Sequence, residues 1–176
     1  MTALSRSSEC AAIVMTLLLF CFLLGCVAGL RSLTAPAVVC WAAHLGWLHF
    51  SGTKLAFINQ PSTLIVFTLL AVVELIADKL PKTPARTAPL GLIARIVVGG
   101  SIGVALATSS GMSVPFPMMV AAVGALVGTF GGYNIRRALV SKGRLPDFAV
   151  AVAEDMIAIA GGLLIVSHLY LADLGR

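Results

Sequence analysis

Charged residues are scarce in this sequence of 176 residues. Only 11% are charged, 12 basic and 7 acidic, whereas 59% are hydrophobic and the mean hydropathy is +1.03. Soluble domains have about 25% charged residues, so these charges are too few to cover the surface of a water-soluble globule. Such an apolar chain cannot stay solvated as a disordered protein either. The composition therefore predicts an integral membrane protein that crosses the lipid bilayer several times.

Cysteine and metal-ligand patterns are scarce as well. Four cysteines are too few for a secreted scaffold held by disulfides. The sequence has no Cys-x-x-Cys or His-x-x-x-His spacing, so we predict no metal site, no cofactor and no catalytic residue. The basic segments are explained by membrane topology, so we expect no nucleic-acid partner. An enzyme is the least favoured class.

Long unbroken apolar runs indicate membrane helices, because the strands of a membrane barrel would alternate in polarity. The second run is short, about 24 Å as a helix against a hydrocarbon core of about 30 Å. The helix of this run is long enough to cross the hydrocarbon core only if it begins as early as Gly29. We predict one all-α transmembrane domain over residues 1–176, a polytopic bundle of five or six spans. The six runs are Cys10–Leu30, Leu33–Leu48, Ser62–Leu80, Leu90–Thr108, Met118–Ile135 and Asp147–Leu171.

Basic residues predict the orientation, because the cytoplasmic loops of membrane proteins are rich in Lys and Arg. Segments 79–89 and 136–146 hold seven of the 12 basic residues, and 109–117 between them holds none. We therefore expect both basic segments to be cytoplasmic in a bacterial inner membrane, with the C-terminus outside. The N-terminus is outside if the second run spans and inside if it does not.

The first run also contains Leu-Leu-Gly-Cys, ending at Cys26, which resembles a lipoprotein cleavage site. The preceding segment has one arginine followed by Glu9, a poor match, and the run continues in small residues toward Arg31. We predict an uncleaved first helix.

Glycines recur at every fourth position, which removes side chains along one face and lets two helices approach closely. We expect this packing within one monomer, with the seam of a homo-oligomer as the alternative. The helix-packing glycines are Gly25, Gly29, Gly99, Gly103, Gly124, Gly128 and Gly132.

Short stretches of the sequence repeat weakly. Spaced glycines followed by an arginine occur in residues 25–31 and again in 124–136. A short stretch of Ala and Val followed by Glu occurs in residues 71–74 and again in 151–154. This suggests two related halves, as in many transporters. Chance matches among abundant Ala, Val and Gly are the alternative. The candidate halves are residues 10–80 and 90–171.

Charges inside the spans are costly, at least about 2.5–3.5 kcal/mol each. The expected intramembrane polar core is Glu74, Asp78, Arg95, Glu154 and Asp155, with Arg31 and Arg136 at the cytoplasmic mouth. We expect Glu74 to pair with Arg95, and Arg31 and Arg136 to be the partners for the late acids. The group either locks the bundle, carries protons or a cation, or binds an anionic substrate or lipid headgroup through the arginines.

Three motifs resemble those of a family of small bacterial integral membrane proteins that is catalogued as a domain of unknown function. They are Gly-Leu-Arg at 29–31, Glu-Leu-x-x-Asp-Lys-x-Pro at 74–81 and Glu-Asp at 154–155. The resemblance covers about residues 20–168. It implies an all-α bacterial membrane protein and supplies no reaction.

The leading functional prediction is a small transporter or channel-like protein, with proton coupling as one form of it, that moves an ion or small solute. The alternative is a membrane protein that transports nothing and instead binds lipid or scaffolds a larger membrane complex.

Overall fold

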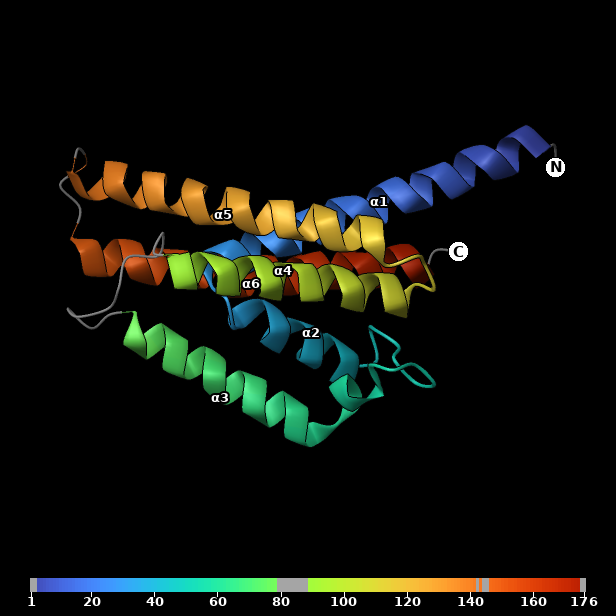
Figure 1. Cartoon of the computed structure of the whole chain (residues 1–176), viewed down its shortest axis with the longest axis horizontal. Coiled ribbons are helices and arrows are strands. Elements are labelled where there is room, and N and C mark those ends of the chain that lie inside the picture. The colour runs from blue at the N-terminus through green and yellow to red at the C-terminus, as the bar shows by residue number, and fades with distance from the viewer. Residues whose placement is uncertain (1–2, 79–88, 142, 144–145, 175–176) are drawn as a thin grey trace.

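The computed structural model describes residues 3–78, 89–141, 143 and 146–174, and every regular element among them is helical. The all-α bundle predicted from the long apolar runs is confirmed. Figure 1 shows the helices running back and forth along one common direction. The elements are α1 (Ala3–Leu30), α2 (Thr34–His44), the 3-10 helix η1 (Ala56–Asn59), α3 (Pro61–Ala77), α4 (Pro89–Ser109), α5 (Pro115–Ser141) and α6 (Asp147–Leu174).

Four of the described helices, α1, α4, α5 and α6, are long and apolar enough to cross a membrane. Proline begins α3, α4 and α5, where its fixed φ suits the first helical turn and its missing N–H is not needed. Gly111, at φ 66°, turns the chain between α4 and α5, a conformation that glycine adopts without strain.

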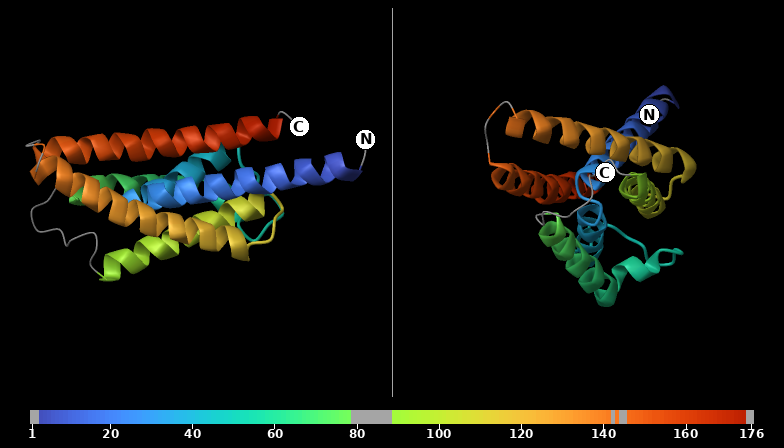
Figure 2. Two further views of the ribbon diagram at one scale, coloured as in Figure 1. Left: turned by 90° about the horizontal axis from the view of Figure 1, so that it is seen from above. Right: turned by 60° about the vertical axis from the view of Figure 1, so that its left-hand side comes forward.

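The second apolar run, for which the sequence left a spanning and a non-spanning helix open, forms a helix too short to span. Its helix α2 has 11 residues, about 16 Å at 1.5 Å per residue, which is about half of the hydrocarbon core. The third run forms α3, which has 17 residues. Figure 2 shows α2 and α3 side by side at one edge of the four long helices, and α2 packs against α6 as well as against α3.

The centre of the bundle is α1, which packs most extensively against α5 and α4. The two helices α1 and α5 run in the same direction (Figure 1), and their glycines face each other's backbones. A Cβ atom at Gly25 would overlap the carbonyl oxygen of Ala121, and one at Gly128 would overlap that of Cys26. Glycine therefore sets the distance between these helices. Gly29, Gly103 and Gly124 also lie against the backbone of a neighbouring helix, whereas a Cβ atom at Gly99 would first meet the side chain of Ala125 and one at Gly132 would meet the side chains of Leu30 and Glu154.

The helices that correspond in the two candidate halves do not all run in the same relative direction. The helices α1 and α5 run in parallel, whereas α3 and α6, which carry the repeated Glu, run in opposite directions (Figure 1). The duplication stays a prediction.

We predict that Gly128→Ala lowers the free energy of unfolding by about 1–3 kcal/mol, because the new methyl group forces α1 and α5 apart. Gly131→Ala is the matched control on the same helix, since nothing lies within 4 Å of a Cβ atom there. Thermal unfolding in detergent, followed by circular dichroism, measures both. Equal stability of the two variants would contradict the assigned packing.

Candidate functional site: the break between α1 and α2

A sharp break in the chain lies inside the bundle, where Arg31, Ser32 and Leu33 separate α1 from α2. The side chain of Arg31 has no exposed surface. It pairs with Asp155 of α6. Asp155 lies about 12 Å along the helix axis from Asp147, the first residue of α6. The last carbonyl groups of a helix and the first N–H groups of the next have no partners within their own helices. Where these groups are buried, water cannot supply those partners, so other side chains must.

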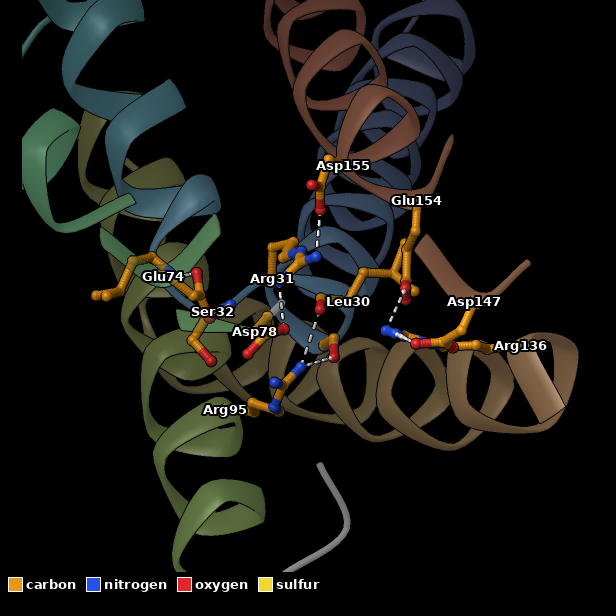
Figure 3. Close-up of polar contacts among 12 residues, drawn as sticks. Leu30, Arg31, Ser32, Glu74, Asp78, Arg95, Arg136, Asp147, Glu154 and Asp155 are labelled. Carbon is orange, nitrogen blue, oxygen red and sulfur yellow. Dashed lines mark hydrogen bonds and ion pairs between the residues drawn. The ribbon is translucent and has the colours of Figure 1, made fainter. Parts of the chain in front are cut away.

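Charged side chains from two other helices satisfy these backbone groups (Figure 3). Arg95 of α4 is 6% exposed, and its Nη1 donates to the carbonyl oxygens of Gly29 and Leu30, at 2.5 and 3.0 Å. The Glu74 carboxylate of α3 accepts the N–H groups of Ser32 and Leu33, each at 2.8 Å. A cation thus sits at the C-terminus of α1 and an anion at the N-terminus of α2. Each charge is favourable there because of the helix dipole.

The expected ion pair between Glu74 and Arg95 is therefore wrong. Both residues reach the same turn, but each bonds to the backbone at one side of the break instead of to the other. The backbone groups at the ends of α1 and α2 have no partners within their own helices, and these two side chains supply them. The hydrophobic pattern shows where the apolar runs end but does not show that the chain reverses within the bundle.

Arg31 is held by acids from two further helices. Its Nη1 pairs with Asp78 at the C-terminal end of α3, and its Nη2 pairs with Asp155 of α6. The side chains of Asp78 and Asp155 are 14% and 9% exposed. A fully buried guanidinium depends on such partners, because removing one partner of a buried pair typically costs about 3–5 kcal/mol.

A second group of charges joins α5 to α6 nearer the helix ends. Arg136 donates from Nε and Nη2 to the two carboxylate oxygens of Asp147, at 2.8 and 2.7 Å. Its Nη1 lies 3.8 Å from Oε2 of Glu154. The side chain of Asp147 is 61% exposed, so this fork adds little stability. Asp147 is not among the charged residues expected from the sequence, although an acid at the start of a helix is a usual dipole partner.

The structure thus brings five of the seven charged residues named from the sequence to the break between α1 and α2, namely Arg31, Glu74, Asp78, Arg95 and Asp155. Arg31 lies with Asp78 and Asp155, whereas Arg136 lies with Glu154. A cavity of about 280 Å³ between α5 and α6 has Glu154 and Arg136 in its lining, and its other residues are apolar. Glu154, which is 8% exposed, therefore borders this cavity.

Other chemistry has little support in the described part of the chain. No three His, Cys, Asp or Glu side chains gather there as a metal site would need. Residues 99–103 spell Gly-x-Ser-x-Gly, the letters of a hydrolase elbow, but they lie within α4. The hydroxyl of Ser101 donates to the carbonyl oxygen of Val97 in the same helix. A nucleophile elbow needs a strand followed by a helix, so this serine has no such setting.

The family model described as "Domain of unknown function (DUF4126)" matches residues 18–174. The chain belongs to this family. The match includes the whole break between α1 and α2 and every charged residue described above. No curated protein and no solved structure matches the chain. Membership of the DUF4126 family names no activity, so function has to be argued from the geometry of the site.

We predict that Glu74→Gln lowers the free energy of unfolding by about 1–3 kcal/mol, because the start of α2 loses a charged acceptor. Asp147→Asn, which alters the exposed fork, serves as the control and should cost less than about 1 kcal/mol. Unfolding in detergent with rising denaturant measures both. Equal losses would show that Glu74 does not act as a buried cap.

Proposed function

We propose that this protein is a small proton-coupled transporter that moves an ion or small solute across the membrane. The observation that carries the proposal is the fully buried Arg31, which lies at a break between two helices and is held by Asp78 and Asp155. Ionisable groups within membrane proteins commonly mark substrate or proton pathways. Discontinuous helices at membrane depth commonly form the binding sites of transporters.

Protonation offers a way for this group to change shape. A proton on Asp78 or Asp155 would neutralise one of the two carboxylates that hold Arg31. The ion pair that connects Arg31 to α3 or to α6 would then weaken. The helix α3 is the element best able to respond, because it packs mainly against α2. The proton would enter through the cavity that Glu154 borders.

The orientation belongs to the same proposal. The first turn of α1 and the last turn of α6 lie at one end of the bundle, and the last turns of α5, which include Arg136 and Arg137, lie at the other end (Figure 1). Segment 79–89 lies outside the described residues except for Pro89. We assign both basic segments to the cytoplasmic side of a bacterial inner membrane, with the C-terminus outside, because short cytoplasmic loops are rich in Lys and Arg.

One observation favours the alternative function of a lipid-binding or scaffolding membrane protein. Glu74 and Arg95 bond to the backbone at the break, which is a structural task. If the whole charged group were structural, neutralising any acid would reduce stability without changing transport.

The two functions predict different results for Glu154→Gln. In liposomes with an imposed pH gradient, we expect wild-type protein to move protons, an ion or a small solute faster than empty vesicles do. Glu154→Gln should reduce this flux at least tenfold while the protein stays folded, and Asp147→Asn should leave it within about twofold. The measurement combines a pH-sensitive dye inside the vesicles with uptake of a panel of labelled solutes.

Two outcomes would contradict the proposal. If wild-type protein gives no flux above empty vesicles with any member of the panel, the protein is not a transporter. If Glu154→Gln and Glu74→Gln reduce stability but leave flux unchanged, the charged group is structural.

A further inference from the structure

A cavity of about 120 Å³ lies at the end of the bundle away from the charged break. It is bordered by α1, by the chain that follows α2, and by the ends of α4 and α6, which lie together in Figure 1. Ser109, which borders it from α4, follows Arg95 of the break by about 21 Å along the helix axis. The cavity is therefore separate from the charged group.

This cavity differs from the other cavities in the polarity of its wall. Polar groups form a large share of its surface, whereas three larger cavities in the described part of the chain are almost entirely apolar. A cavity with several polar groups in its wall favours water or a polar solute over a lipid chain. The polar side chains that border it are Thr16 of α1, His49 beyond α2, and Ser109 and Ser110 at the end of α4.

The fold presents His49 to this cavity. The N–H groups of Trp47 and Leu48 both donate to the carbonyl oxygen of Ala42, at 2.8 and 3.3 Å, which fixes the turn after α2. Leu48 and Phe50 are buried, at 5% and 0% exposed, so the chain is anchored on each side of His49. His49 itself is exposed and borders the cavity.

The polar side chains offer both hydrogen-bond acceptors and donors. The hydroxyl groups of Thr16 and Ser109 each donate to a carbonyl oxygen of their own helix, at 2.8 and 3.0 Å, so their oxygen atoms remain as acceptors. Within the described residues, the side chains of His49 and Ser110 make no hydrogen bond, so each can donate as well as accept. A ligand that carries several hydroxyl groups matches this set, because a hydroxyl group also does both.

The lining selects against charged ligands. None of the described residues around the cavity is an Asp or Glu, which would hold a cation, or a Lys or Arg, which would hold an anion. Taking an unpaired charge out of water is unfavourable, so an uncharged ligand fits best.

The volume of the cavity limits the size of the ligand. Cavities of about 150 Å³ bind benzene, so a cavity of about 120 Å³ suits a solute of about four to six heavy atoms. The indole ring of Trp47 forms part of the wall and stacks on Tyr170, with ring centroids 6.1 Å apart. This ring provides an apolar surface for the carbon atoms of such a solute.

We propose that this cavity binds a small uncharged polyol of about the size of glycerol. Its hydroxyl groups donate to the oxygen atoms of Thr16 and Ser109 and form hydrogen bonds with His49 and Ser110. Its carbon atoms lie against Trp47. The proposal concerns binding alone and does not depend on transport.

Saturation-transfer difference NMR tests the proposal, because it detects a weakly bound solute through the protons of that solute. Glycerol is titrated into the full chain in nanodiscs, with empty nanodiscs of the same lipid as the reference. We expect a saturable signal that empty nanodiscs do not give. Propan-1-ol, which has the same carbon skeleton with a single hydroxyl group, should bind at least about tenfold more weakly, because the hydrogen bonds of two hydroxyl groups are lost. Glycerate, which carries a carboxylate, should also bind more weakly than glycerol.

Variants around the cavity locate the binding site. Ser110→Phe fills the cavity and should abolish the saturable signal. Ser113→Phe is the matched control, because Ser113 lies in the same turn, is exposed and is not among the residues that border the cavity. His49→Phe keeps a ring, removes its nitrogen atoms and should weaken glycerol binding about fivefold, as expected for one lost hydrogen bond. His168→Phe, at an exposed position near the end of α6, should leave binding unchanged.

Three results would overturn the proposal. The first is a glycerol signal that is no larger with the protein than with empty nanodiscs. The second is a saturable signal that survives both Ser110→Phe and His49→Phe at wild-type strength. The third is binding of propan-1-ol or glycerate as tight as that of glycerol, which would assign the cavity to an apolar or an anionic solute instead. Circular dichroism of each variant confirms that it is folded.

Discussion

The structure depends on one buried cation. Arg31 lies where α1 stops and α2 turns back, and its guanidinium has no exposed surface. Burying a charge in an apolar environment is unfavourable unless it is paired, so the turn is stable only while Asp78 and Asp155 hold it. Because these acids come from α3 and α6, the requirement to neutralise Arg31 also fixes two helices that are far apart in the sequence.

The same physical constraint explains the other charges at the break. A helix that ends within a membrane leaves carbonyl and N–H groups that neither water nor lipid can satisfy. Arg95 supplies donors to the end of α1, and Glu74 supplies acceptors to the start of α2. Glycine then allows α5 to approach α1 closely enough to cover the break. Charge and close packing together make a short, non-spanning α2 possible in an apolar chain.

Much of this architecture could be predicted from the sequence. The scarcity of charge predicted a membrane protein, and the apolar runs placed the four long helices. The charged residues of the site were identified because charges inside apolar runs are costly and therefore informative. The length of α2 and the roles of Glu74 and Arg95 could not be predicted, because an apolar run gives no sign that its helix stops at His44. Which side chains cap the backbone groups at the break is decided only when the helices pack together. The similar depth of Glu74 and Arg95 therefore suggested an ion pair that the structure does not form.

A double-mutant cycle between Arg31 and Asp155 is the most direct test of the claim that this buried pair holds the break together. The free energy of unfolding in detergent is measured for Arg31→Gln, Asp155→Asn and the double variant. Each single change should cost about 3–5 kcal/mol, because it leaves an uncompensated buried charge. The double variant should recover at least about 2 kcal/mol of the summed loss through the coupling of the two sites. Losses that simply add would contradict the account, since Arg31 and Asp155 would then contribute independently.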